Sequence, residues 1–282
     1  MNIRNWPLRN WPLLAVAVTL NCALDAQIIS DGFEYDDGSL LAEVWDGRAA
    51  FTGSGDAADQ TALRIENQAL RIDWGTAVAE PLTSDKHSAQ RFYGDAFAPG
   101  EETVLYTAFD LTVTEAPTAT DQGRPTFYLH KDGAADRGRI GIQGGGEGDS
   151  FQLGVSTNPG FYSAFDFSDI NLSLNQTYRI GLAYDVDSTT TTLWVDASSA
   201  NVTPFVQQIG SPGDARTPNR GVFQAESAGL SAEEHYGAML IDDFQFGTDA
   251  AIIPEPSTYV LLSGAGALVL VLLRRSPRKR IA

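Results

Sequence analysis

A regular alternation of apolar and polar residues in the middle of the chain limits its possible folds more than any other feature. Five large apolar side chains occupy every second position of one stretch: Tyr178, Ile180, Leu182, Tyr184 and Val186. A period of two is typical of a half-buried β-strand. Asp187 and Ser188 then supply a turn, and the β-branched segment 189–195 follows. Together these residues predict a β-hairpin.

Similar strand patterns recur along the chain. They cover residues 103–114, 125–130, 139–143 and 151–156, and a second hairpin spans 63–72 with its turn at 66–68. Before the C-terminal region, no stretch of about 12 residues shows helical periodicity. Many strands separated by Gly, Asn and Asp turns predict an all-β sandwich or barrel. Residues 27–253 suit a single large all-β domain.

The N-terminal region has the three parts of a secretory signal peptide. Arg4 and Arg9 are followed by an apolar stretch at 11–20 and by the small residues Ala23 and Ala26. We therefore predict a signal peptide over residues 1–26, cleaved after Ala26, with cleavage after Ala23 as the alternative. The single cysteine, Cys22, lies inside this segment. The exported domain would then rely on its core, without disulfides.

The C-terminal region, residues 254–282, combines three features in order. The sequence Pro254-Glu255-Pro256 precedes the segment 257–273, which is apolar from Tyr259 to Leu273, and a basic tail of five residues follows: Arg274, Arg275, Arg278, Lys279 and Arg280. The apolar stretch is just long enough, at about 1.5 Å per residue, to cross a hydrocarbon core of about 30 Å. It predicts a transmembrane helix with its basic tail in the cytoplasm and the large domain outside.

This tripartite order resembles the PEP-CTERM sorting signal of Gram-negative bacteria. The resemblance implies recognition by exosortase, a membrane cysteine protease, at Pro254, Glu255 and Pro256, followed by removal of the tail. A membrane-anchored precursor would become a mature form at the cell surface or in the extracellular matrix. A plain C-terminal anchor is the alternative. The predicted order is signal peptide 1–26, β-sandwich 27–249, linker 250–253 and sorting signal 254–282.

Three segments of the exported region resemble the concanavalin A-like, LamG-type jelly roll. They are residues 29–38 at its start, 174–180 with 192–196 in its middle, and 240–247 at its end. The resemblance implies a β-sandwich of two antiparallel sheets with the first and last strands adjacent. Because one fold hosts many functions, it does not identify an activity.

The exported region is strongly acidic. Residues 27–253 hold 34 of the 36 acidic residues and 12 of the 19 basic ones, a formal net charge of −22. Nucleic-acid binding requires a basic surface, so this class of partner is excluded. An acidic surface favours solubility and suits cations or an extracellular polysaccharide matrix.

Patterns for catalysis are incomplete. The nearest match to the E-x-D-x-x-E strand of jelly-roll glucanases is Glu147, Asp149 and Gln152, and an amide cannot donate the proton that the third acid supplies. His87, His130 and His235 are far apart in sequence, and no G-x-S-x-G motif is present. We therefore predict a protein that is not an enzyme, with a polysaccharide hydrolase as the more remote alternative.

A carbohydrate-binding module is the first functional alternative. Trp194 alternates with Leu193 and Val195, which predicts that its ring points away from the core. Phe161 and Tyr162 follow an Asn-Pro-Gly sequence and could lie at a loop tip, where sugars stack on aromatic rings. The competing interpretation for all three is ordinary packing, because large aromatic side chains mostly serve cores.

Two aspartates suggest a structural calcium ion. Asp31 shares its parity with Ile29 and Phe33, and Asp242 shares its parity with Phe244. Each carboxylate would therefore face the core, and the jelly-roll resemblance brings the two strands together. Carboxylate and carbonyl oxygens are the ligands that Ca²⁺ prefers. The alternatives are a β-bulge that turns the aspartates to solvent, or hydrogen bonds from backbone N–H groups.

Overall fold

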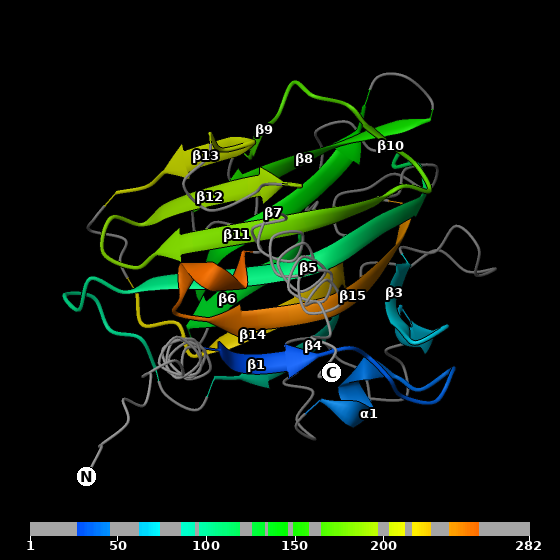
Figure 1. The fold of residues 1–282 in the computed structure, drawn as a ribbon, viewed down its shortest axis with the longest axis horizontal. Helices are drawn as coiled ribbons and strands as arrows, with labels where there is room; N and C mark the ends of the chain where they lie inside the picture. Colours follow the sequence, from blue (N-terminus) through cyan, green and yellow to red (C-terminus); the bar gives the residue numbers. More distant parts are fainter. Residues whose placement is uncertain are drawn as a thin grey trace, which may run out of the picture.

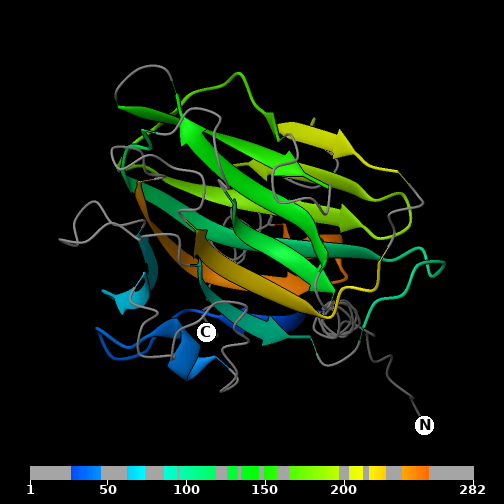
Figure 2. The same ribbon diagram turned by 180° about the vertical axis from the view of Figure 1, so that it is seen from behind.

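The chain forms a two-layer β-sandwich. The computed structural model describes residues 27–45, 62–73, 86–93, 96–118, 126–132, 135–145, 149–157, 165–196, 203–211, 216–226 and 237–253. The predicted signal peptide and the sorting region 254–282 lie outside these ranges. The two layers are sheet A, which faces the viewer in Figure 1, and sheet B, which faces the viewer in Figure 2.

Sheet A has eight strands. Its order is β13 (Val206–Ile209), β12 (Thr190–Val195), β11 (Thr177–Asp185), β5 (Val104–Glu115), β15 (Ala238–Gly247), β3 (Ala69–Asp73) and β2 (Leu63–Glu66), and β1 (Gln27–Asp31) also pairs with β15. Sheet B has seven strands. Its order is β10 (Leu172–Ser173), β8 (Ser150–Ser156), β7 (Ala135–Gly144), β6 (Thr126–Asp132), β14 (Arg220–Glu226) and β4 (Lys86–Phe92), and β9 (Asp166–Phe167) also pairs with β8. Every pairing of these strands is antiparallel, as the jelly-roll resemblance implied.

Both hairpins predicted from the sequence are confirmed. Strands β11 and β12 pair from Ile180 opposite Val195 to Asp185 opposite Thr190. The Asp185 carboxylate accepts hydrogen bonds from two backbone N–H groups of the following turn, both at 2.9 Å. Strands β2 and β3 join through Asn67 and Gln68, whose φ angles of 54° and 61° match the turn that suits hairpin twist.

The sequence patterns missed several strands of sheet B. Strand β14 pairs with β4 over seven residues, yet neither segment alternates strongly between apolar and polar side chains. Strand β7 begins at Ala135, earlier than its predicted start at residue 139. Helical structure within the described ranges is limited to the four-residue α1 (Leu41–Val44) and the 3₁₀ turn η3 (Ala250–Ile252).

Strand β15 connects the two ends of the domain. Its first part, 238–241, pairs with β3, and its last part, 244–247, pairs with β1, while β5 runs along its other edge. The prediction that the first and last strands are adjacent is therefore confirmed. Between the two partners, at Asp242 and Asp243, the register with β5 shifts.

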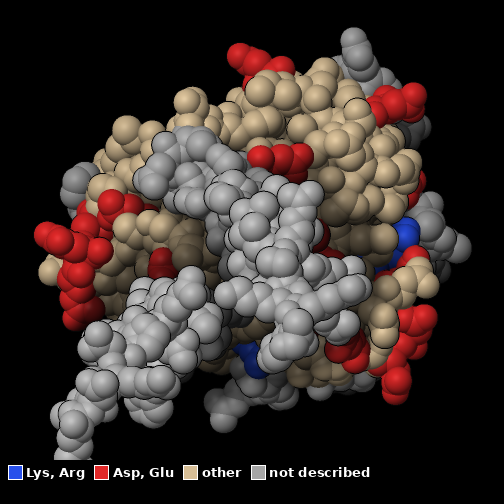
Figure 3. Space-filling model, in the orientation of Figure 1, with Lys and Arg blue, Asp and Glu red and all other residues tan. Residues whose placement is uncertain are grey.

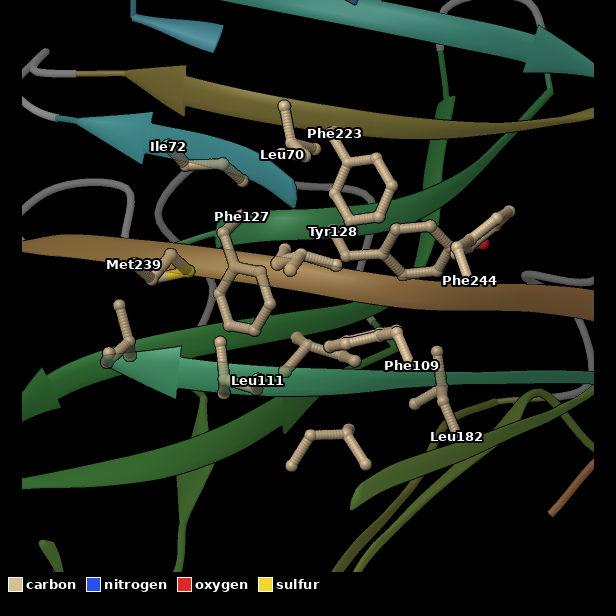
Figure 4. Close-up of a cluster of buried hydrophobic side chains, with 14 of the residues drawn as sticks. Leu70, Ile72, Phe109, Leu111, Phe127, Tyr128, Leu182, Phe223, Met239 and Phe244 are labelled. Carbon is tan, nitrogen blue, oxygen red and sulfur yellow. The ribbon is translucent and has the colours of Figure 1, made fainter. Parts of the chain in front are cut away.

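The core lies between the sheets and is rich in aromatic rings (Figure 4). Phe109 and Met239 come from sheet A, and Phe127, Tyr128 and Phe223 come from sheet B; all five are fully buried. Phe223 lies 5.0 Å from Tyr128 between ring centroids, close enough for favourable edge contacts. This core between the two sheets stabilises the domain.

The described surface carries many acidic side chains. On the face shown in Figure 3, Asp and Glu side chains predominate over Lys and Arg and lie mainly near the rim. This distribution agrees with the negative charge of residues 27–253. Among the described residues, no helix has the length and hydropathy needed to span a membrane. The predicted transmembrane helix 257–273 falls outside them.

Candidate functional site

The outer face of sheet B, turned away from sheet A, carries a row of amide side chains. Phe151 and Leu153 of β8 enter the core, so Gln152 points outward. Gln143 stands directly opposite it on β7. The Gln143 Nε2 donates to Gln152 Oε1 at 2.8 Å, and Gln152 Nε2 donates to Asn171 Oδ1 at 3.0 Å. We call these three residues the amide row.

Two aromatic rings cover glycines beside the amide row. Gly141 and Gly154 are opposite each other on the outer face. A Cβ at either position would lie 2.7 Å from the ring of Phe165 or Phe167, respectively. Since such an approach is too close for a side chain, glycine is required for the rings to lie over the strands.

Two further polar side chains, Arg139 and Gln224, lie on this outer face and are buried. The Arg139 guanidinium lies 5.1 Å from the Phe165 ring centroid and donates to Ser156 Oγ at 2.9 Å. On β14, the Gln224 side chain is only 2% exposed, and no described residue donates a hydrogen bond to its Oε1. Because the Gln224 side chain is buried, this oxygen is not open to a ligand in this arrangement.

The amide row has a defined chemical polarity. Each amide offers two donors and one acceptor oxygen. The two internal hydrogen bonds run in one direction, leaving the oxygen of Gln143 at one end and the amino group of Asn171 at the other. Acceptors and donors at fixed spacing, flanked by aromatic rings, can bind a ligand rich in hydroxyl groups.

His130 is not part of this surface. His130 is fully buried, and its Nδ1 lies 2.6 Å from the hydroxyl of Tyr93. Burial lowers the pKa of His130 to about 3, so its imidazole is neutral at physiological pH. It packs between the sheets against Tyr184 and Phe246. Of the other residues considered for catalysis, Glu147 and His235 lie outside the described residues.

Asp31, one of the two predicted calcium ligands, is 8% exposed and faces the core as expected. Its carboxylate accepts hydrogen bonds from the backbone N–H of Phe33 at 2.8 Å, from Tyr35 Oη at 2.8 Å and from Trp45 Nε1 at 2.7 Å. Arg91 adds an ion pair at 3.6 Å. These groups satisfy the buried charge without a metal ion.

The prediction that Asp242 faces the core is wrong. Met239 and Ile241 are buried before it and Phe244 and Phe246 after it, so the inward parity changes within β15. The change occurs at a β-bulge, where Asp243 has a φ of 45°. The extra residue turns Asp242 to the outer face, opposite Asp110 of β5.

The two aspartates therefore lie on opposite faces of sheet A, and the structure does not bring them together as joint ligands. Asp242 Oδ1 instead accepts from the backbone N–H of Asp243 at 2.7 Å. Within the described part of the chain, no group of three His, Cys, Asp or Glu side chains is placed to hold a metal ion. Structural calcium stays a prediction.

Trp194 points away from the main core, as predicted, but its ring is only 6% exposed. On the outer face of sheet A it packs with Ala183 and with Ile253, against partly buried Val104 and Tyr106. Ile253, in the segment 250–253 predicted as a linker, thus covers the proposed sugar-stacking ring. Trp194 is unavailable to a ligand in this arrangement. Phe161 and Tyr162, the other two candidate residues, lie outside the described residues.

Comparison with known proteins identifies the C-terminal segment. The family model for the PEP-CTERM protein-sorting motif matches residues 253–279. This match includes the three residues predicted for sorting and most of the basic tail. The chain therefore carries a PEP-CTERM sorting motif, which signals an exported, exosortase-processed protein of Gram-negative bacteria. No curated protein matches the chain.

Solved structures offer distant likenesses. The alginate lyase AlyA1 from Zobellia galactanivorans is 12% identical, with a TM-score of 0.48 over 79% of this chain and 95% of the lyase. An endo-β-1,4-glucuronan lyase from Trichoderma reesei is 12% identical, with a TM-score of 0.45 over 82% and 99%. A sialidase is 13% identical with a TM-score of 0.41, over 79% of this chain but only 19% of the sialidase.

The sequence carries a signal for part of the amide row. Gln152, Gly154 and Ser156 alternate with the core residues of β8, so their outward direction was predictable. Their neighbours Gln143 and Asn171 could not be assigned, because the pairing of β7, β8 and β10 depends on tertiary structure.

Proposed function

We propose that this protein is a non-catalytic β-sandwich exported to the cell envelope or extracellular matrix, where exosortase removes its C-terminal tail. The observation that carries the proposal is the position of the sorting motif. Ile253, the last described residue of the domain, is 2% exposed, and the matched motif begins at this residue. A β-sandwich followed at once by a sorting signal is the arrangement expected of an exported domain that is sorted through its C-terminal segment.

The described chemistry supports a non-catalytic role. Asp149 precedes β8 in a position that resembles a glucanase acid, but its partner position holds Gln152, which is engaged in the amide row. The histidine that the structure describes fully, His130, is enclosed in the core. Glycoside hydrolysis requires two suitably spaced carboxyl groups flanking the bond that breaks. Asp149 offers one carboxyl group and Gln152 offers none, so these two positions do not supply the required pair.

Mass spectrometry of surface material from the native host tests the sorting proposal. We expect mature protein that lacks Arg274–Arg280. Replacing Pro254, Glu255 and Pro256 by alanine should leave the intact precursor in the membrane, as should deletion of exosortase. Recovery of the basic tail on the mature surface form would reduce the motif to an anchor.

A carbohydrate-binding role is the second candidate, and the amide row favours it. Uncharged amides bind hydroxyl groups without requiring a charged ligand. Trp194 does not take part in this proposed binding, because Ile253 covers its ring. The proposed binding face is therefore the outer face of sheet B, in place of the outer face of sheet A around Trp194.

Affinity electrophoresis through gels containing the host's extracellular polysaccharide tests this second role. We expect retardation of the wild type, and Gln152→Ala should weaken binding about tenfold, as for the loss of one or two hydrogen bonds. Gln207→Ala, on the outer face of sheet A, is the matched control and should bind normally. Equal mobility with and without polysaccharide rules out binding to that polymer, and release of reducing sugar would instead reveal a hydrolase.

A further inference from the structure

The last described residues of the chain form a short stem that is docked on the outer face of sheet A. We call residues 249–253 the C-terminal stem; it includes η3, the orange helical ribbon in front of the sheet in Figure 1. Asp249 caps this turn, because its Oδ1 accepts from the backbone N–H of Ala251 at 2.9 Å. Ile253, at the end of the stem, is almost fully buried.

The surface that receives Ile253 is shaped for it. On β11, Gly181 has no side chain, and a Cβ there would lie 2.9 Å from Ile253 Cγ2. Ala183 and Trp194 complete the buried contact, with Val104 and Tyr106 at its edge. Burying one isoleucine side chain makes the docked stem more populated than the free stem, by a factor on the order of ten to a hundred.

This contact lies next to the sorting motif. The motif matches from residue 253, so the buried isoleucine is its first matched residue. Proteases act on segments that open locally, and cleavage follows the population of the open form when opening and closing are fast. A stem held on the sheet reduces the population of chains in which the peptide before Pro254 is free to enter a protease.

We propose that the docked C-terminal stem controls exosortase processing, so that the tail is removed from the form in which Ile253 has left sheet A. The inference rests on the proposed sorting by exosortase. The contact between Gly181 and Ile253 then acts as an autoinhibitory latch. Its strength sets the fraction of precursor that is competent for cleavage, and hence the processing rate.

A disulfide can lock the latch. In a disulfide, the Cβ of one cysteine lies about 3.0 Å from the sulfur of the other, given an S–S bond of about 2.04 Å. The Cβ position at Gly181 lies 2.9–3.2 Å from the side-chain atoms of Ile253, so the double variant Gly181→Cys/Ile253→Cys matches this geometry. The exported region has no native cysteine with which these two could mispair.

Pulse–chase labelling in the native host measures removal of the tail from the full chain. We expect the oxidised double-cysteine precursor to be processed at least tenfold more slowly than wild type, since the free stem would be almost absent. Reductant should restore the rate. The single variants Gly181→Cys and Ile253→Cys are the controls, and each should be processed with no dependence on reductant.

A release variant tests the opposite direction without changing the motif. Gly181→Val places methyl groups in the space that Ile253 occupies, so processing should be about three- to tenfold faster. Thr177→Val, on the same face of β11 and away from the stem, should have no effect. On purified precursor in detergent, Gly181→Val should shift the Trp194 emission to longer wavelength, and Trp194→Phe identifies that component.

The outcomes separate the inference from the proposal beneath it. Equal processing rates for wild-type, locked and released chains would overturn the latch and leave sorting intact. A locked chain cut as fast as wild type would do the same, even if the release variant is faster. A wild-type precursor that keeps its tail in the native host would overturn the sorting proposal and the latch together.

Discussion

The indole N–H of Trp45 donates a 2.7 Å hydrogen bond to the carboxylate of Asp31. This contact links α1's C-terminal end to the last residue of β1 and lies at the edge of the aromatic core. It explains how a carboxylate can face the interior beside the first strand. Because Asp31 accepts two further hydrogen bonds, its charge organises three different donors.

Replacement of Asp31 should therefore be costly. In Asp31→Asn the amide group cannot accept from all three donors, and we expect the free energy of unfolding to fall by about 2–4 kcal/mol. Asp242→Asn is the matched control, because Asp242 is exposed, and its effect should stay within about 0.5 kcal/mol. Urea unfolding of both variants measures the difference; similar effects would refute the assignment of Asp31 as a buried acceptor.

Chelator-stripped protein tests the calcium prediction. Since Asp31 and Asp242 lie on opposite faces of sheet A, we expect no rise in melting temperature with millimolar Ca²⁺. An ion bound only by the folded state would raise it. A rise that chelator reverses and Asp242→Asn abolishes would establish the calcium site despite this arrangement.

His130 should make stability fall in mild acid. Its pKa is about 3 in the folded protein and about 6.5 when exposed, so below pH 6.5 only the unfolded chain binds this proton. The contribution of neutral His130 is complete above pH 6.5 and is lost at about 1.4 kcal/mol per pH unit as the pH falls toward 3. Urea unfolding between pH 7 and pH 4.5 should show a shallower decline for His130→Gln. Parallel declines would contradict burial of a neutral imidazole.

Gly221 should tolerate no side chain. A Cβ at this position would lie 2.8 Å from Tyr128 Oη and 3.0 Å from Tyr93 Oη, inside the core. We expect Gly221→Ala to destabilise the fold by about 1–3 kcal/mol through overpacking. Gly32→Ala, whose nearest neighbour would be 3.7 Å away, is the comparison and should cost less. Thermal melts that rank the two variants in the reverse order would contradict the packing around the tyrosines.

Arg179 should stabilise the bulge in β15. Its Nη1 donates to the backbone oxygen of Asp243 at 3.0 Å and to its carboxylate at 2.9 Å, and it contacts Asp110 at 3.2 Å. Burial raises the pKa of Asp110, and Arg179 opposes that rise. Arg179→Met should therefore raise the pKa of Asp110 further and reduce stability by about 1 kcal/mol, less at high salt.

A pH titration of Asp110 by NMR measures the first effect, and a double-mutant cycle with Asp243→Ala measures the second. A coupling energy near zero would show that the ion pair between Arg179 and the Asp243 carboxylate does not stabilise the fold. An unchanged pKa of Asp110 would show that the ion pair is absent in solution.

The elements that could be predicted from the sequence are those with local signals. Alternation over 178–186 and the turn at Asp187 and Ser188 determine the β11–β12 hairpin, because each strand's inward face is encoded in its own residues. The sorting motif is likewise a local pattern. Strands β4 and β14 lack strong alternation, and their extended form depends on pairing with each other in sheet B.

The sequence by itself determined the class of fold, the period of its clearest strands and the sorting motif at its C-terminal end. Only the tertiary structure decided which way Asp242 points, because the change of neighbour from β3 to β1 coincides with a bulge that reverses the parity of β15. It also decided that Ile253 covers Trp194. Parity shows that a ring leaves the core, but a segment distant in sequence determines whether that ring reaches solvent.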